Sequence, residues 1–70
     1  MEIKNIDKVD LEKNVIKVVV IDKSGDYAWY DTTPLEPEPL EDILDTLNFD
    51  LDDIISMTVE YQDGSVVAYI

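Results

Sequence analysis

The sequence contains no cysteine, no histidine and no arginine. Without cysteine, the chain can form neither a disulfide framework nor a thiolate metal site. Without histidine and arginine, it lacks the usual general base and the side chain that clamps a phosphate with paired hydrogen bonds. Ser24, Ser56 and Ser65 have no nearby base in the sequence to activate them as nucleophiles. We therefore expect a protein that is not an enzyme and that uses no cofactor.

Basic residues are confined to the first third of the chain. Residues 1–23 carry five lysines and five acids, whereas residues 24–70 carry twelve acids and no base, so the formal net charge is −12. A charge of this size repels nucleic acids and anionic lipid surfaces and attracts a basic surface. We therefore expect no direct nucleic-acid binding, no membrane association and a basic protein as partner.

Long hydrophobic runs are also absent. The runs at residues 18–21 and 66–70 are both far too short to span a membrane, and residues 1–13 lack the apolar core of a signal peptide. These features predict a cytoplasmic protein. A chain of 70 residues with 46% hydrophobic residues is expected to fold as one small domain, residues 1–70, rather than remain a disordered acidic tail.

The most acidic stretch is residues 34–53, with eight acids and no base. Pro34 and Pro37 predict a stiff connector over residues 33–38, and Pro39 fits the first turn of a helix. Asn48 is a suitable C-terminal stop for that helix. Between these limits an apolar stripe recurs at helical spacing, at Leu40, Ile43, Leu44 and Leu47.

Two hairpins flank the acidic stretch. Residues 15–22 are β-branched and almost wholly apolar, which predicts a central strand buried on much of both faces. Gly25 supplies the positive φ of the turn that follows, and residues 27–32 return as the second strand. Alternation places Tyr27, Trp29 and Asp31 on one face of that strand, where the aromatic residues serve either core packing or an interface.

The second hairpin is predicted over residues 54–70. Asp63 and Gly64 suit a type I′ turn between strands at 54–61 and 66–70. In the first of these strands one face is predicted to comprise Ile55, Met57, Val59 and Tyr61. The predicted fold class is α+β: an antiparallel sheet in the order β-β-α-β-β with one helix on one face. The sheet has four strands, or five if residues 1–14 add one.

The acids of the central stretch and the residues beside them are the candidate partner-binding site. Exposed, solubilising charge is the simpler interpretation for any single acid. A stabilised helix face, however, mixes Glu with Lys four residues on, and no lysine follows Lys23. Carboxylates strung along a helix and its loops can imitate a row of DNA phosphates. The candidate residues are Asp31, Glu36, Glu38, Glu41, Asp42, Asp45, Phe49, Asp50, Asp52 and Asp53.

Two further expectations concern these acids. Asp50, Asp52 and Asp53 offer close carboxylates, but the calcium-loop pattern with a central glycine and a terminal glutamate is absent, so no metal site is expected. Mimicry of DNA also requires several acids to share one continuous surface, namely Asp42, Asp45, Asp50, Asp52 and Asp53.

Residues 17–31, KVVVIDKSGDYAWYD, followed by an acidic helix and by DDIISMTVEY at 52–61, resemble the smallest phage-encoded uracil-DNA glycosylase inhibitors. The resemblance covers roughly residues 15–61. It implies a short acidic DNA mimic, commonly a dimer, that plugs the DNA groove of the glycosylase. Acids then replace phosphates, and an apolar pocket grips the intercalating side chain of the enzyme.

The sequence therefore predicts a DNA-mimic inhibitor encoded by a phage or mobile element. Its target would be a uracil-DNA glycosylase, a CRISPR effector, a restriction enzyme or a histone-like protein of the bacterial host. One alternative is a small protein-interaction domain that docks by its sheet edge or helix, with the acids serving solubility. Another is an idealised α+β mini-domain without a function, against which the proline-rich connector argues.

Overall fold

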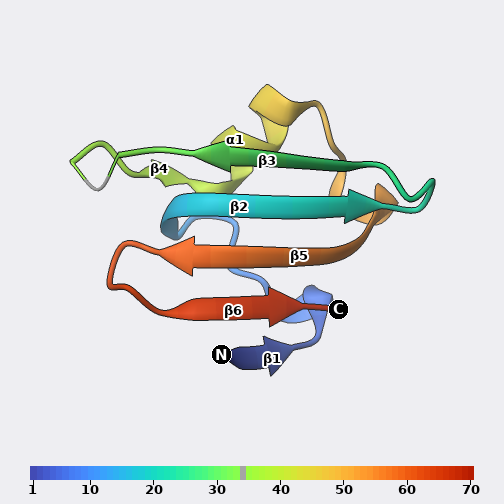
Figure 1. The fold of residues 1–70 in the computed structure, drawn as a ribbon, viewed down its shortest axis with the longest axis horizontal. Coiled ribbons are helices and arrows are strands. Elements are labelled where there is room, and N and C mark those ends of the chain that lie inside the picture. The colour runs from blue at the N-terminus through green and yellow to red at the C-terminus, as the bar shows by residue number, and fades with distance from the viewer. Residues whose placement is uncertain (34) are drawn as a thin grey trace.

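One helix lies behind a six-stranded sheet, which makes the fold α+β (Figure 1). The computed structural model describes residues 1–33 and 35–70; Pro34, part of the predicted connector, lies outside the described residues. Helix α1 spans Leu40–Leu47, and two 3₁₀ turns span Ile6–Lys8 and Leu51–Asp53. The strands are β1 (Glu2–Lys4), β2 (Asn14–Asp22), β3 (Tyr27–Asp31), β4 (Glu38–Pro39), β5 (Ile54–Tyr61) and β6 (Val66–Tyr69).

The sheet is mixed, whereas the sequence predicted an antiparallel sheet of four or five strands. Its order is β1-β6-β5-β2-β3, and the short β4 pairs with one end of β2. Strand β1 runs parallel to β6, with Ile3 opposite Ala68. The predicted antiparallel sheet is wrong here because β1 and β6 are joined through the whole sheet rather than by a hairpin, so a parallel pairing is open to them.

The core lies between α1 and one face of the sheet. Leu40, Ile43 and Leu44 point from the helix into this layer, and Val15 and Val18 of β2 are fully buried in it. The central position of β2 is confirmed, since it lies between β3 and β5. Burial on both of its faces is wrong: only one face has a helix to cover it, so Lys17 and Ile21 on the other face are exposed.

Two β-bulges decide which side chains of β2 and β5 reach the core. The register between these strands shifts between Val15 and Lys17, and again between Ile21 and Asp22. The second shift buries Ile54 and turns Ile55 outward, where it is 51% exposed. The predicted inward orientation of Ile55 is therefore wrong, because a bulge interrupts the alternation of side chains along a strand.

The ends of α1 are set by residues with restricted or unusual backbone conformations. Pro39 belongs to β4, opposite Asn14, and lies just before the helix rather than in its first turn. Asn48 ends the helix as predicted, in the left-handed conformation with φ 63°. The Phe49 N–H donates to the Leu44 carbonyl at 3.0 Å, which directs the chain back toward the sheet.

The second hairpin turn differs from the predicted type I′. That type needs positive φ at both central residues, but within residues 1–33 and 35–70 only Asn48, Gly25 and Gly64 have positive φ. The Asp63 carboxylate instead accepts the Ser65 N–H at 2.9 Å, which holds Asp63 in an ordinary conformation. Gly64, with φ 89°, takes the left-handed position.

Candidate functional site: an acidic surface around Phe49

Helix α1 turns its acids away from the core. Because its apolar stripe faces the sheet, Glu41, Asp42 and Asp45 are all exposed on the solvent side. Glu41 and Asp42 occupy the first turn, where the helix dipole favours negative charge. Asp45 lies near the opposite end, where the dipole disfavours it, and the last turn contains no basic residue.

Three candidate acids meet over an apolar floor. Glu41, Asp45 and Asp50 line a shallow depression of about 150 Å³, which we call the Phe49 hollow. Its other lining residues are Leu11, Leu44, Phe49 and Leu51. Leu11 reaches this place because its carbonyl accepts the Glu41 N–H at 2.9 Å, which ties the N-terminal arm to the start of α1. The hollow therefore combines negative charge with an apolar surface.

Phe49 connects this hollow to a second depression of about 260 Å³, which Asp53 also lines. Phe49 is half-buried and packs against the core. The Lys23 N–H donates to the Asp53 carbonyl at 2.9 Å, so the chain after α1 is tied to the first hairpin turn. Asp42 and Asp52 are exposed but line neither depression.

The remaining candidate acids lie elsewhere. Asp31, Glu36 and Glu38 line a third depression, of about 450 Å³, between the end of β3 and β4. The alternation of β3 places Asp31 on the sheet face opposite α1. The structure thus brings one group of predicted residues together around Phe49 and a second group beside β4, and it places Asp42 and Asp52 in neither group.

Within the described residues no candidate acid forms an ion pair with a lysine, and Lys23 is the one lysine that lines either depression around Phe49. Among the described residues the one ion pair joins Lys4 Nζ to Glu2 Oε1 at 3.8 Å, and neither belongs to the candidate site. Lys13 lies over the ring of Tyr61, 4.2 Å from its centre. In the same part of the chain, no three His, Cys, Asp or Glu side chains are grouped so as to hold a metal ion. The acids of the Phe49 hollow are therefore exposed carboxylates that form no ion pair with a lysine of the described residues.

Two perturbed groups lie outside the site. Burial raises the pKa of Tyr61, and its hydrogen bond with Tyr69 adds to the effect. Hydrogen bonds from the Ser65 side chain and backbone lower the pKa of Asp63, which is fully exposed. Both groups belong to the second hairpin and line neither depression around Phe49.

The structure also reveals residues that sequence reasoning did not assign to a site. Leu11 forms part of the floor of the Phe49 hollow, and no pattern in the sequence pairs it with α1. The sequence left undecided whether Trp29 and Tyr27 serve core packing or an interface. In the structure they are 59% and 71% exposed and face away from α1. Alternation along β3 was the signal that grouped them.

No helix in the described ranges has both the length and the apolarity to cross a bilayer. Comparison with known protein families, with curated proteins and with solved structures finds no match for this chain.

Proposed function

We propose that this chain is a DNA-mimic inhibitor, which binds through its acidic surface to the basic DNA-binding surface of another protein. The observation that carries the proposal is the Phe49 hollow. There Glu41, Asp45 and Asp50 surround an apolar floor, and no ion pair to a lysine of the described residues neutralises them.

This combination suits a lysine or arginine side chain of the partner. Such a side chain packs its methylene stem on an apolar surface and keeps its charged head among polar groups. Hydrogen bonds between these cations and carboxylates are among the strong ones in proteins. DNA-binding proteins use the same two residue types to contact phosphates, so a surface that binds their heads competes with DNA.

The charge distribution of α1 supports a role beyond solubility. Glu41 and Asp45 are four residues apart, a spacing at which like charges destabilise a helix. Asp45 also lies at the end of the helix where negative charge is unfavourable. A net charge of −12 raises the rate of encounter with a basic partner. Binding to a basic partner thus explains why α1 carries Glu41 and Asp45 at positions where their charges lower the stability of the helix.

The proposed targets are DNA-binding proteins of a bacterial host cell: a uracil-DNA glycosylase, a CRISPR effector, a restriction enzyme or a histone-like protein. The resemblance of residues 15–61 to small glycosylase inhibitors favours the first. In this proposal the chain acts without a cofactor and catalyses no reaction.

The experiment is a pull-down from bacterial lysate with the tagged chain, eluted by a salt gradient and, separately, by duplex DNA. We expect one DNA-binding protein to be retained, released by moderate salt and displaced by duplex, because contacts between exposed charges are screened by ions. The double variant Asp45→Asn with Asp50→Asn should retain much less of it.

The matched control removes the same number of charges elsewhere. Asp7→Asn with Glu12→Gln neutralises two exposed acids in the charge-balanced N-terminal part. Retention by this variant should stay close to that of the unmodified chain. Equal losses in both double variants would make net charge alone responsible, and a retained partner indifferent to salt and to duplex would overturn the proposal.

A second candidate function is a protein-interaction domain that docks by its sheet, with the acids serving solubility. The exposure of Trp29 and Tyr27 on the open face favours it, since aromatic residues are enriched among interface hot spots. Docking through these side chains predicts a partner whose retention depends little on salt and is lost in Trp29→Ala.

A further inference from the structure

Strand β3 forms one edge of the sheet, and β1 forms the other. Within residues 1–33 and 35–70, no strand pairs with the side of β3 that faces away from β2 (Figure 1). An edge strand presents a row of backbone N–H and C=O groups that can pair with another chain. The edge of β3 is therefore a place where a further strand can be added to this sheet.

The hydrogen bonds of β3 show which of its backbone groups are free for such pairing. The Thr32 N–H donates to the Ile16 carbonyl at 2.7 Å, and the Asp26 carbonyl accepts the Asp22 N–H at 2.9 Å. Every second residue of an antiparallel strand turns its N–H and C=O toward the same neighbour. The residues between these turn theirs away from β2, toward the edge, and they are Tyr27, Trp29 and Asp31.

The two edges of the sheet differ in how well they are protected. Strand β1 has three residues and carries Lys4, whose Nζ lies 3.8 Å from Glu2 Oε1. Short length and charged side chains, lysine above all, are the usual means of blocking an edge. Strand β3 has five residues, without lysine or proline, and its pairing with β2 is regular from Tyr27 to Asp31. The edge of β3 is thus the one open to strand addition.

Acidic side chains surround this open edge. Asp26 precedes β3 and Asp31 ends it, and both are exposed. Glu36 and Glu38 line a depression with Asp31 just beyond the strand. Lys17 lies opposite Asp31 on β2, but the described residues contain no ion pair between them. Two copies joined by this edge would bring their acids together, whereas a basic segment is attracted to them.

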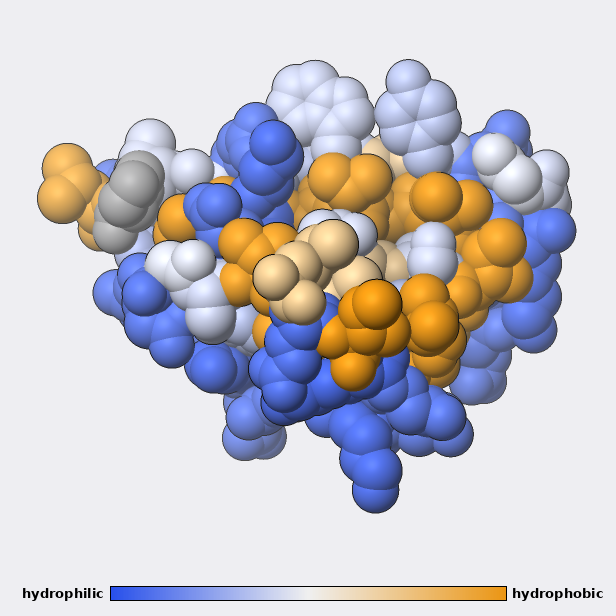
Figure 2. All heavy atoms as spheres, turned by 60° about the horizontal axis from the view of Figure 1, so that its bottom comes forward, coloured by the Kyte–Doolittle hydropathy of each residue, from blue (hydrophilic) through white to orange (hydrophobic). Residues whose placement is uncertain are grey.

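The outer side chains of an added strand would meet two aromatic residues and an acid. Residues directly opposite one another share a face of the sheet, so these side chains would lie beside Tyr27, Trp29 and Asp31 on the face that α1 leaves uncovered. In Figure 2, hydrophobic side chains gather over the sheet above a hydrophilic lower side. Lysine or arginine suits this place, because its stem packs on apolar surface while its charge contacts an aromatic ring or a carboxylate.

The inner side chains of an added strand would meet the core side of β3. Ala28 and Tyr30 are half-buried, and Tyr30 packs against the core. Helix α1 contacts β3 and lies behind this part of the sheet in Figure 1. An apolar side chain opposite Ala28 or Tyr30 would extend the buried layer beyond the present edge. The edge therefore suits a strand in which basic and apolar residues alternate.

We propose that β3 binds an extended segment of another protein, in which lysine or arginine alternates with apolar residues, as an additional strand of the sheet. In this mode of recognition, backbone hydrogen bonds supply affinity and alternate side chains supply specificity. The surface is separate from the Phe49 hollow, so the proposal does not rest on the proposed function.

The probe is a capped peptide of about seven residues, a usual strand length, in which lysine and valine alternate. Amide hydrogen exchange measured by NMR follows its binding. We expect the N–H groups of Tyr27, Trp29 and Asp31 to become protected, whereas those of Ala28 and Tyr30, which already face β2, should change little.

A second peptide controls for charge. It has the same composition, but its lysines are grouped in one half and its valines in the other, so it carries the same charge without alternation. It should bind about tenfold more weakly than the alternating peptide, because it cannot place basic side chains on one face and apolar ones on the other.

Two variants at one position separate the backbone from the side chain. Trp29→Ala and Trp29→Pro both remove the indole, but only proline also removes the N–H that faces the open edge. Proline is tolerated in an edge strand where the N–H faces solvent. Trp29→Pro should bind the alternating peptide about tenfold more weakly than Trp29→Ala. Circular dichroism and a thermal melt verify that both variants are folded, and the exchange measurement on the unmodified chain needs no substitution.

Four results would overturn the proposal. They are no binding of the alternating peptide, equal binding of both peptides, binding that leaves the three edge amides unprotected, and equal binding by the two variants. The third would indicate a peptide lying across the uncovered face, over the hollow of about 210 Å³ that Val19, Thr58 and Val66 line beside Trp29.

Failure of this proposal is distinguishable from failure of the proposed function. Asp45→Asn with Asp50→Asn changes acids outside β3 and its edge, so that variant should still prefer the alternating peptide. Trp29→Pro leaves the acids of the Phe49 hollow in place and should still retain a target that duplex DNA displaces.

Discussion

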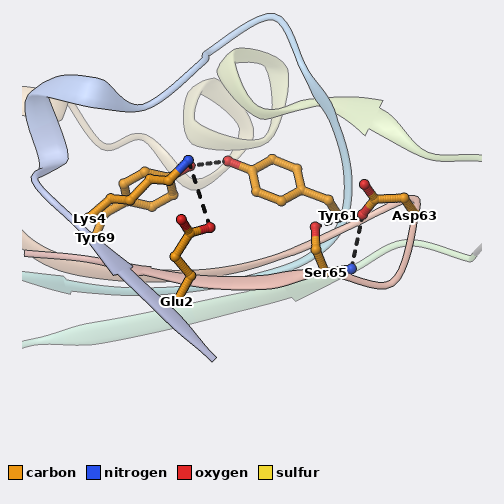
Figure 3. Close-up of polar contacts among 6 residues, drawn as sticks. All are labelled: Glu2, Lys4, Tyr61, Asp63, Ser65 and Tyr69. Atoms are coloured by element: carbon orange, nitrogen blue, oxygen red, sulfur yellow. Dashed lines mark hydrogen bonds and ion pairs between the residues drawn. The ribbon is translucent and has the colours of Figure 1, made fainter.

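The hydroxyl of Tyr61 on β5 is hydrogen-bonded to the hydroxyl of Tyr69 on β6 within the core (Figure 3). Both residues are buried, at 2% and 3% exposure. Each hydroxyl is the partner that the other needs, because a buried polar group without a hydrogen bond is costly. The pair therefore joins the two strands of the second hairpin through their side chains as well as their backbones.

Replacing one tyrosine of this pair should cost more than half of the unfolding free energy that is lost when both are replaced. Tyr61→Phe leaves the Tyr69 hydroxyl buried and unpaired, so we expect a loss of about 1–3 kcal/mol in unfolding free energy. Tyr69→Phe should behave alike, and the double variant should lose clearly less than the two single losses combined. Urea denaturation of the four chains measures this coupling; strict additivity would show that the bond contributes nothing specific.

Stability should fall at alkaline pH because of Tyr61. Its pKa is raised by burial in the folded state, whereas the unfolded chain loses this proton near the ordinary value of 10.0. The contribution of the protonated Tyr61 hydroxyl to the stability of the fold is therefore fully present below pH 10 and is lost as pH rises above it. Tyr61→Phe should flatten this decline, whereas Tyr27→Phe, at an exposed position, should leave it unchanged. Thermal melts across alkaline pH make the comparison.

Neutralising Asp45 should stabilise the fold while weakening the binding proposed above. Asp45 lies in the last turn of α1 and four residues after Glu41, so Asp45→Asn should raise unfolding free energy by about 0.3–1 kcal/mol. Asp42→Asn removes the same charge from the first turn, where the dipole favours an acid. We expect that variant to be neutral or less stable. Urea denaturation at low salt compares the two, and a stabilised Asp45→Asn with undiminished target binding would contradict a binding role for this acid.

The turn at Asp63 should weaken in acid. Hydrogen bonds from Ser65 hold the pKa of Asp63 below its ordinary value of 3.8, so the folded state favours the ionised carboxylate. The contribution of the ionised Asp63 carboxylate to stability is present above pH 3.8 and is lost as pH falls through the lower pKa of the folded state. Ser65→Ala removes the hydroxyl that donates at 2.6 Å and should reduce the acid-induced loss of stability. A chain whose acid denaturation is the same with and without the hydroxyl would contradict this.

Much of the fold follows from local patterns in the sequence. The stripe from Leu40 to Leu47 predicted α1, Asn48 predicted its end, and β-branched residues predicted β2. The errors arose where pairing rather than local pattern decides. A bulge turns Ile55 outward, and β1 pairs parallel to β6. Both features depend on how strands that are distant in the chain pair with one another.

The sequence by itself determined the charge of −12, the absence of lysine after residue 23, and the elements that carry the acids. Those properties need no contact between distant residues. Only the tertiary structure decided that Leu11 and Phe49 form one floor beneath Glu41, Asp45 and Asp50, and that Trp29 lies beside a hollow on an uncovered sheet face. The physical reason is that both surfaces arise where separate segments pack, and one helix can cover only one face of a sheet.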